Sequence, residues 1–567
     1  MKDTNQRLFL AIAIWLAFIF GYFTFFAPRK TAQPATPAPA ARAPSATAAA
    51  PPSAPAAQGH AADVPRGTAA APPLREVVFE TSRARIVVSS EGAALRSVQL
   101  LGDKFTRHKG RKEESHVDLV QPHAGEALPF STVLRDAAGT EILAANEPFA
   151  LVQQDAHSAT FRSERGGISL TKTLAVSANA YGIDLAVEVK SAAAFSGQLA
   201  VVSGAHADEP AGGMFASRTN TPARTLCLYG ANKSERVAIG AKHPEFDAPG
   251  ALFAGIDEQY FLTAVVPPQG VTASCRLEAR GEKTGSLLAS LIVPLQVTAG
   301  GTAQLAFKGY SGPKNAEDLG AVAPVLKHAI DWGFWSVIAE VLLSIMKFCH
   351  RIVPGHNWGI AIIMLTLAMK ALTFPLQHKS MKSMQEMQRL QPQLDEMKKK
   401  FAGDTQRQNL EQMKLFKEHG VNPMGSCLPM VIQMPIWFAL YTTLQVSVEL
   451  YNAPFIPGWI DDLTGKDPYY ILPVAMGITM ILTQVLTPSP MSNPSQKTMG
   501  YVMSGFFSLL MLTLPSGLTL YIFTNNVLSI AQQMYLRRTL GGPPASGRTL
   551  ELKGGGAGTA DGAKLRA

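Results

Sequence analysis

The strongest constraint on this chain is a set of apolar segments that are long enough to cross a lipid bilayer. Residues 8–26 run for 19 positions without a charge, and about 20 helical residues span the roughly 30 Å of hydrocarbon in a membrane. Charged residues make up 16% of the chain and apolar residues 47%, whereas soluble domains carry about 25% charged residues. These values exclude an ordinary cytosolic enzyme, and the abundant apolar surface excludes a disordered chain.

The first apolar segment has two interpretations. A cleaved signal peptide has an apolar core of about 7–15 residues followed by small residues, whereas this segment is longer and ends in aromatic residues before Ala27 and Pro28. We therefore favour an uncleaved anchor at residues 1–26. Residues 27–73 hold 19 Ala and 11 Pro, a composition typical of an extended, unfolded linker.

Residues 74–323 have the pattern of an all-β domain. Short segments rich in β-branched residues alternate with Gly, Pro, Asn and Asp, and strict apolar/polar alternation is clearest at 168–174 and 183–189. Further strands are expected at 77–79 and 84–88. The spacing predicts an antiparallel β-sandwich. The region holds 24 basic and 26 acidic residues, so its charge gives no sign of nucleic-acid binding.

The C-terminal half returns to apolar segments. Residues 324–354 contain polar side chains that recur every three or four positions and so share one helix face: Ser336, Glu340, Ser344, Lys347 and Arg351. We interpret this segment as an amphipathic helix that lies in the membrane interface. Further spans are expected at 357–376, 424–448, 469–487, 498–514 and 518–536.

The basic residues of the connecting segments predict the orientation of these spans. Residues 377–423 carry nine Lys and Arg and the tail 537–567 carries six, whereas loops 449–468 and 488–497 carry one each. Basic loops stay on the cytoplasmic side, so both termini are expected in the cytoplasm and the β domain outside. Counting 324–354 as a span would place the basic 377–423 loop outside, which supports the interfacial interpretation.

The predicted fold class is an α-helical polytopic membrane protein with six transmembrane helices plus an external all-β sandwich. The expected parts are an anchor at 1–26, a linker at 27–73, the β domain at 74–323, an interfacial helix at 324–354, a second transmembrane helix at 355–378, a cytoplasmic helical hairpin at 379–422, transmembrane helices three to six at 423–537 and a basic tail at 538–567.

Motifs of common catalytic and cofactor sites are missing from the sequence. It contains no P-loop, no GxGxxG after a strand, no HExxH, no CxxC and no GxSxG. His108, His116 and His123 are spaced too loosely to predict a metal site. Cys227 and Cys275 share the β domain and would pair if they lay close together, but we expect two buried thiols. We therefore expect no catalytic residue, no cofactor and no metal.

Lys370 is the most informative single residue. It lies within an apolar span, where a lysine costs about 2.5–3.5 kcal/mol on insertion scales. Snorkelling of its ammonium to the cytoplasmic surface is the simpler explanation. We favour a functional role because other spans also carry internal polar groups, which together predict a hydrated cavity. Those groups are Thr366, Gln433, Gln484, Asn525 and Asn526, although such amides also commonly join helices to one another.

The cytoplasmic segment 378–422 is predicted to be a helical hairpin with a stripe of Met, Leu and Phe that is interrupted at Ala402-Gly403-Asp404. The stripe either packs the two helices together or binds apolar partners, for which flexible methionines are suited. The Gly-rich basic tail either sets the topology or contacts RNA or anionic lipid.

Five segments of the C-terminal half resemble the YidC family of membrane protein insertases, in its Gram-negative form with a large periplasmic domain. They are NWGIAIIMLTLAMKALTFPL at 357–376, LQPQLDEMKKKF at 390–401, HGVNPMGSCLPMVIQMPIWFALY at 419–441, DPYYILPVAMGITM at 467–480 and LPSGLTLYIFTNN at 514–526. The N-terminal part resembles the family in layout more than in motif.

The resemblance implies a five-helix insertase core, in the bacterial inner membrane, that inserts and folds newly made membrane proteins alone or with the Sec translocon. It implies a positively charged groove open to cytoplasm and lipid, in which Lys370 stands at the position of a family arginine. Gln433, Gln484 and Tyr521 match other groove positions, and we assign Thr366 and Asn526 to the same groove. Nascent membrane proteins, Sec components, the ribosome (through the hairpin and the tail) and membrane lipids are the implied partners.

Two other functions are compatible with parts of the sequence. A secondary transporter would explain an intramembrane lysine, but transporters usually contain internal repeats, and the five later spans are unequal. A membrane-anchored cell-wall enzyme or sugar-binding protein would place a pair of carboxylates in a cleft of the β domain, yet the spacing of Asp and Glu identifies no such pair.

Overall fold

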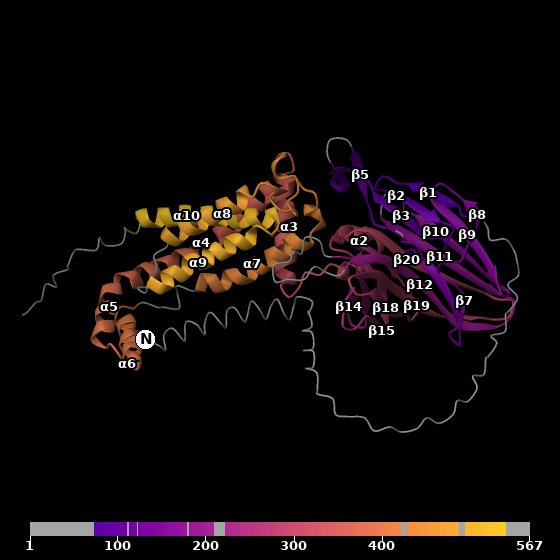
Figure 1. Cartoon of the computed structure of the whole chain (residues 1–567), viewed down its shortest axis with the longest axis horizontal. Coiled ribbons are helices and arrows are strands. Elements are labelled where there is room, and N and C mark those ends of the chain that lie inside the picture. The colour runs from indigo at the N-terminus through magenta and orange to yellow at the C-terminus, as the bar shows by residue number, and fades with distance from the viewer. Residues whose placement is uncertain are drawn as a thin grey trace, which may run out of the picture.

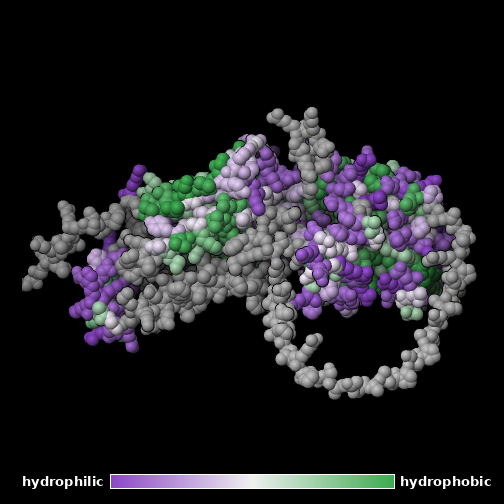
Figure 2. Space-filling view, in the orientation of Figure 1, coloured by the Kyte–Doolittle hydropathy of each residue, from purple (hydrophilic) through white to green (hydrophobic). Residues whose placement is uncertain are grey.

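A computed structural model describes residues 73–109, 113–121, 123–177, 181–208, 222–420, 428–486 and 494–539. The predicted anchor and linker, and the tail from residue 540, lie outside these residues. The described chain forms a β domain and a helical part placed end to end (Figure 1). Apolar residues gather on the visible face of the helical part, and the α5–α6 hairpin at its far end is polar (Figure 2).

The β domain consists of sheets of five, nine and six strands in which neighbouring strands are antiparallel, as predicted. The five-stranded sheet has the order β1 (Glu76–Glu80), β2 (Ala84–Ser89), β3 (Ala94–Leu100), β5 (Glu113–Asp118) and β4 (Thr106–Lys109), with the 3-10 turn η1 (Asp103–Phe105) after β3. The nine-stranded sheet has the order β14 (Lys233–Val237), β13 (Arg224–Tyr229), β16 (Ala251–Asp257), β17 (Phe261–Val266), β20 (Thr302–Pro313), β11 (Gly182–Ser191), β10 (Ile168–Val176), β9 (Ser158–Arg165) and β8 (Ala150–Gln154). The six-stranded sheet has the order β15 (Glu245–Pro249), β18 (Ser274–Gly281), β19 (Thr284–Val297), β12 (Phe195–Asp208), β6 (Ser131–Asp136) and β7 (Glu141–Leu143).

Strands β10 and β11 show why the alternating pattern predicted a sandwich. Every second residue of β10 is buried, and β11 alternates in the same way. The two strands pair in register from Ile168 opposite Ser191 to Val176 opposite Ile183. Because strand side chains point alternately to the two faces of a sheet, one face of this pair lines the core.

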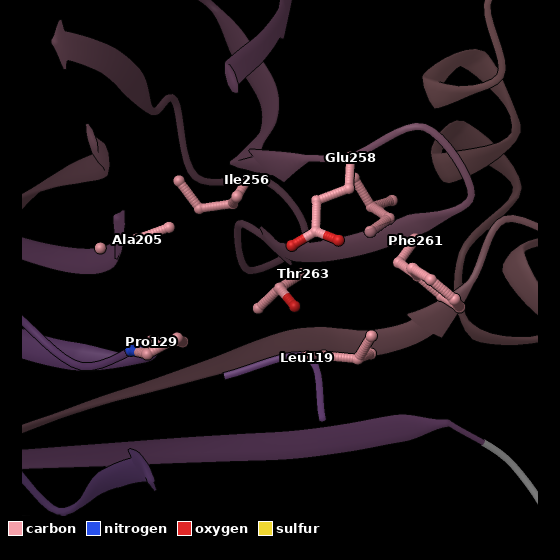
Figure 3. A pocket seen from close by; sticks show the side chains of 9 residues that line it. Leu119, Pro129, Ala205, Ile256, Glu258, Phe261 and Thr263 are labelled. Carbon is pink, nitrogen blue, oxygen red and sulfur yellow. The ribbon is translucent and has the colours of Figure 1, made fainter. Parts of the chain in front are cut away.

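A small pocket opens in the β domain where β12, β16 and β17 meet the segments before and after them (Figure 3). Its lining is mostly apolar, and the carboxylate of Glu258 points toward Thr263 across it. Glu258 is the only carboxylate among the lining residues of the described chain. The pair of carboxylates expected of an anchored glycan-cleaving enzyme is therefore not found in this pocket.

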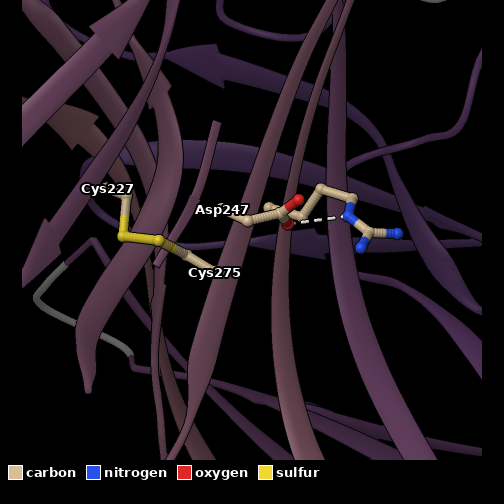
Figure 4. The surroundings of a disulfide bond; sticks show 4 residues. Cys227, Asp247 and Cys275 are labelled. Carbon is tan, nitrogen blue, oxygen red and sulfur yellow. Dashed lines mark hydrogen bonds and ion pairs between the residues drawn. A yellow bond between two sulfur atoms is a disulfide. The ribbon is translucent and has the colours of Figure 1, made fainter. Parts of the chain in front are cut away.

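A disulfide bond joins Cys227 of β13 to Cys275 of β18, with 6.4 Å between their Cα atoms (Figure 4). It links the nine-stranded sheet to the six-stranded sheet. The expectation of two unpaired thiols was wrong, because the two strands stack face to face although the cysteines are 48 residues apart in sequence. Disulfides persist in oxidising compartments.

The helical part follows the β domain through two short helices. These are α2 (Ala316–Val322) and the 3-10 helix η4 (Pro324–Ala329). The longer helices are α3 (Ser336–Ile352), α4 (Trp358–Arg389), α5 (Gln391–Lys400), α6 (Thr405–Glu418), α7 (Leu428–Val446), α8 (Ile471–Leu486), α9 (Pro494–Met511) and α10 (Ser516–Thr539), and the 3-10 turn η6 (Val448–Leu450) follows α7.

Within the described residues, one helical segment, Trp358–Met384, is both long and apolar enough to cross a membrane, and Ile471–Leu486 and Thr498–Met511 are shorter apolar helices. Proline, glutamine and asparagine inside α7 and α10 lower the mean hydropathy of those helices. The count of six spanning helices stays a prediction.

Helix α3 has a more complex surface than a two-faced amphipathic helix. Its buried face packs on α4 and α7. Val337, Val341 and Phe348 form a second, exposed apolar face. Lys347, one residue of the predicted polar face, forms an ion pair with Glu449 at 2.7 Å and is therefore not simply exposed to solvent.

Helices α5 and α6 form a hairpin within the segment 379–422, but α4 continues through Pro375 into the first part of that segment and ends at Arg389. The break at Ala402-Gly403-Asp404 separates α5 from α6, and Asp404 caps α6 by accepting a hydrogen bond from the Arg407 amide. Met387, Leu390, Leu394 and Phe416 pack together, whereas Leu410 and Met413 stay exposed. The stripe therefore joins the helices and also leaves apolar side chains outside.

The β domain docks on the helical part through the segment after α7. The ring of Tyr451 packs against Phe105, Tyr260 and Phe261, with centroid separations of 6.1, 5.1 and 5.3 Å. The Asn452 side chain donates to the Lys104 carbonyl at 3.1 Å. The contact combines aromatic packing with hydrogen bonds, such as the one from the Gln259 side chain to the Gln445 carbonyl at 3.0 Å, and it joins segments more than 180 residues apart in sequence.

Candidate functional site

Lys370 belongs to α4, is half-buried, and directs its side chain toward α10. Its ammonium donates to Ser529 Oγ at 2.7 Å and lies 3.5 Å from Asn525 Oδ1. No carboxylate of the described residues forms an ion pair with it. A partly buried cation that meets only neutral oxygens keeps the capacity to bind an anion.

Helix α10 supplies one polar face to this region. Tyr521, Asn525 and Ser529 are four residues apart, so they lie one above another on the helix. Tyr521 is buried, and its hydroxyl lies within hydrogen-bonding reach of the Gln433 side chain from α7. Three helices, α4, α7 and α10, therefore contribute polar groups to one region.

The start of α10 is held by the loop that precedes α8, which fixes the direction of this face. The Ser516 amide donates to the Gly465 carbonyl at 2.7 Å, and its hydroxyl donates to the Asp462 carbonyl at 3.0 Å. The same loop holds α8 through Asp467, which is buried and accepts from the Leu472 amide at 2.7 Å. Apolar side chains fill the bundle around this loop, including Leu450, Ile460, Leu463 and Leu518.

Thr366 and Asn526 lie close to this region in sequence but use their polar groups differently. Thr366, one turn before Lys370, is 2% exposed, and its hydroxyl donates to the Ile362 carbonyl of its own helix at 2.7 Å. The Nδ2 atom of Asn526 is buried without an acceptor among the described residues. Asn526 therefore offers a free hydrogen-bond donor, whereas Thr366 does not.

Gln484 is placed apart from the other candidate residues. It is exposed on α8, and its side chain lies against Gly500 of α9, where an added Cβ would fall 1.9 Å from Gln484 Nε2. Within the described residues, no hydrogen bond joins it to Lys370, Gln433 or Tyr521. The structure thus brings together Lys370, Asn525 and Ser529, and pairs Gln433 with Tyr521, but it places Gln484 elsewhere.

Ser529 is the partner of Lys370 that the sequence did not single out. A serine in an apolar helix is common, because its hydroxyl bonds the backbone one turn earlier, and Ser529 also donates to the Asn525 carbonyl at 2.7 Å. The available signal was its spacing of four and eight residues from Asn525 and Tyr521.

Comparisons with known protein families cover nearly all of the described chain. A family model described as "60Kd inner membrane protein" matches residues 348–542, and a model described as "YidC periplasmic domain" matches residues 76–345. The boundary between the two models falls inside α3, where the helical part begins.

Curated relatives match across most of their own length. A membrane protein insertase YidC of Anaeromyxobacter sp. (strain Fw109-5) is 41% identical over 471 residues, which cover 81% of this chain and 84% of the relative. A membrane protein insertase YidC of Geobacter metallireducens is 33% identical over 556 residues, covering 94% and 99%. A crystal structure of an active YidC insertase with its first transmembrane domain resolved is 19% identical, with 82% of this chain and 95% of that chain covered and a TM-score of 0.35.

Proposed function

The chain belongs to the YidC family of membrane protein insertases, and from this premise we propose that it inserts newly made membrane proteins through a polar groove between α4, α7 and α10. The family consists of bacterial inner-membrane proteins with a periplasmic domain. Its members are named as insertases and not as enzymes, since insertion makes and breaks no covalent bond.

One observation carries the groove proposal: Lys370 is a half-buried cation whose partners among the described residues are the neutral oxygens of Ser529 and Asn525. The ammonium attracts a carboxylate more strongly than it attracts these neutral oxygens, because opposite charges add a Coulomb attraction that is larger in a partly buried region than in water. An acidic residue on the polar flank of an entering hairpin would therefore displace Ser529 and Asn525 and bind Lys370. The unpaired Nδ2 of Asn526 on the same helix adds a further donor for such a flank.

The groove would lower the cost of moving the polar flank of a substrate. Polar groups cross less hydrocarbon where the protein supplies donors, and the apolar part of the substrate then moves sideways into lipid. That second step is favourable by about 25 cal/mol for each Å² of apolar surface removed from water. Side chains exposed on α8 and α9, such as Ile478, Val485, Val502 and Leu509, suit a surface in contact with lipid.

We also infer the orientation of the chain. The basic α5–α6 hairpin lies at the end of the helical part that is far from the β domain (Figure 1), which supports a cytoplasmic hairpin and cytoplasmic termini by the positive-inside rule. The Cys227–Cys275 disulfide supports an oxidising compartment around the β domain. Cooperation with the Sec translocon, and ribosome contact through the hairpin and basic tail, belong to the same proposal.

The test is insertion into proteoliposomes of a substrate whose translocated segment carries acidic residues. Lys370→Glu should reduce the protease-protected product at least about tenfold, which corresponds to about 1.4 kcal/mol of lost attraction. Lys370→Arg should stay close to wild type, because the charge is kept although a guanidinium binds in a different geometry. Lys379→Glu is the matched control, since it makes the same charge change at an exposed position of the same helix.

Normal insertion by the Lys370→Glu protein, at matched reconstitution, would contradict the groove proposal. A loss that is equal for Lys370→Glu and Lys379→Glu would assign the effect to the overall charge of the cytoplasmic side. Uptake of a small solute that depends on Lys370, without insertion, would instead favour a transporter.

A further inference from the structure

Two histidines and a glutamate meet at one edge of the β domain, away from the groove. His206 lies near the end of β12, and His123 and Glu126 lie in the segment between β5 and β6. The Nδ1 atom of His206 is 2.8 Å from Glu126 Oε1, and the two imidazole rings stack with centroids 4.1 Å apart. One ligand atom from each of the three residues lies within 4.8 Å of the others.

A tight turn brings His123 and Glu126 together. The Glu126 amide donates to the His123 carbonyl at 3.2 Å, and Gly125 at the third position of the turn has a φ of 84°. A positive φ at this position is the requirement of a type II turn and favours glycine. The turn therefore fixes the two side chains next to each other independently of any contact with β12.

Gly204 allows this turn to lie flat against β12. It is two residues before His206 and so shares its face of the strand. A Cβ atom at Gly204 would fall 2.1 Å from the Ala127 carbonyl oxygen, so any other residue would push the segment away. The close approach of this backbone is what places Glu126 against His206.

We propose that His123, Glu126 and His206 form a binding site for a divalent transition metal of the zinc class. Two imidazole nitrogens and one carboxylate oxygen suit zinc and its neighbours in the first transition row, whereas calcium and magnesium prefer oxygen ligands. Zinc holds such atoms at about 2.0–2.2 Å, so they must approach to about 4.3 Å or less of one another. The His123 Nδ1 atom lies 4.0 Å from Glu126 Oε2, and the His123 side chain is half-exposed and so has room to approach His206.

This site was not predictable from local sequence, because His206 is 80 positions away from Glu126. The spacing of His123 from His108 and His116 is too loose to predict a metal site. The three ligands leave coordination positions open toward solvent. The site adjoins the pocket of Figure 3, since Pro129, Gly204 and Ala205 line that pocket, and a bound metal would clamp the 123–127 segment beside it.

The test is metal binding by the full-length protein in detergent, purified without a histidine tag and stripped with a chelator. Cobalt(II) reports the ligand geometry through its visible absorption, and zinc competition gives the affinity. Wild type should bind one cobalt ion that zinc displaces and that protects the 123–127 segment from hydrogen exchange. Removing a residue that only orients a metal ligand weakens metal affinity about 10–100-fold. Removing a ligand itself should have at least that effect, so His206→Gln, Glu126→Gln and His123→Gln should each weaken cobalt binding at least tenfold.

The control is His243→Gln, an exposed histidine of the same domain, which should bind cobalt as wild type does. His123→Gln decides the test if His206→Gln does not fold, because His123 lies in an exposed turn and is not needed for the sheet. Wild-type protein without stoichiometric cobalt binding, or unchanged binding by His123→Gln and Glu126→Gln, would overturn the proposal and leave only a hydrogen bond between His206 and Glu126.

Discussion

Lys314 of the β domain and Lys370 of the helical part show two ways of accommodating an ammonium group that is withdrawn from water. In the β domain, Lys314 is 6% exposed and binds Asp257 at 2.9 Å, and Arg236 and Arg224 bind the same carboxylate at 2.9 and 3.2 Å. In the helical part, Lys370 binds only neutral oxygens. The first arrangement pairs the ammonium with an opposite charge, whereas the second leaves Lys370 without a carboxylate partner among the described residues.

The β domain and the helical part also differ in where their apolar side chains lie. The β domain encloses its apolar side chains in one large core and closes it with a disulfide. The helical part exposes apolar side chains along α8 and α9 and keeps unpaired amide groups inside, such as Asn526 Nδ2. Exposed apolar side chains of this extent are typical of a surface that contacts lipid or a partner, in agreement with the membrane insertase family to which the chain belongs.

The largest effect is expected when the charge cluster of the β domain is broken. Asp257→Asn would leave Lys314, Arg236 and Arg224 without their common carboxylate, and removing one partner from a buried ion pair costs about 3–5 kcal/mol. Far-ultraviolet circular dichroism during denaturant unfolding measures it, because residues 74–323 contain no tryptophan. Asp247→Asn, at the exposed pair with Arg276, is the control and should cost at most about 1 kcal/mol.

The same cluster predicts a direction for the pH dependence. Burial by itself raises the pKa of Asp257, but Lys314, Arg236 and Arg224 outweigh it and hold that pKa well below its ordinary value. The stabilisation is therefore complete above the pKa of the unfolded chain, about 3.9, and is lost as pH falls through the lower folded value. Asp257→Asn should lack this acid-dependent loss, and an unchanged profile would contradict the role of the cluster.

The second effect concerns the link between the two large sheets. Cys275→Ser opens a 48-residue loop, and the chain-entropy model gives about 4 kcal/mol for a loop of this length, with measured values mostly about 2–4 kcal/mol. Urea unfolding of the β domain in the full-length protein measures the loss. A reducing agent should destabilise wild type by a similar amount and leave Cys275→Ser unchanged, and equal sensitivity of both proteins would show that the bond is absent.

The smallest effect is expected at the contact between the two parts. Tyr451→Ala removes the ring that packs on Phe105, Tyr260 and Phe261, and a half-buried aromatic residue contributes about 1–3 kcal/mol. Amide exchange should become faster in the segments around Phe105 and Tyr260 while the β core stays protected. Tyr469→Ala, at a residue that is 63% exposed, should change neither, and loss of protection throughout the β domain would mean that docking and folding are not separable.

The sequence predicted features that depend on neighbouring residues. The alternation at 168–174 and 183–189 identified β10 and β11, and Gly403 with Asp404 marked the break between α5 and α6. Features that join distant residues were not predictable in this way. The Cys227–Cys275 bond, the contact of Lys370 with Ser529 and the approach of His206 to Glu126 each depend on the packing of separate elements. Gln484 and Lys370 are both polar residues in apolar segments, which is why the sequence suggests a common site. The orientation of α8 about its own axis decides which neighbour the Gln484 side chain contacts, and that neighbour is Gly500 of α9.

The central claim is that substrates pass the polar region between α4, α7 and α10, and site-specific photo-crosslinking tests it most directly. A photoreactive residue is placed at Gln433, at Ser529 or, as control, at Val527, which is 41% exposed and lies on another face of α10. Each protein is then offered a ribosome-arrested membrane protein. If substrates pass this region, crosslinks to the arrested chain from positions 433 and 529 exceed those from 527. Crosslinks from 527 alone, or equal crosslinks from all three positions, would contradict it.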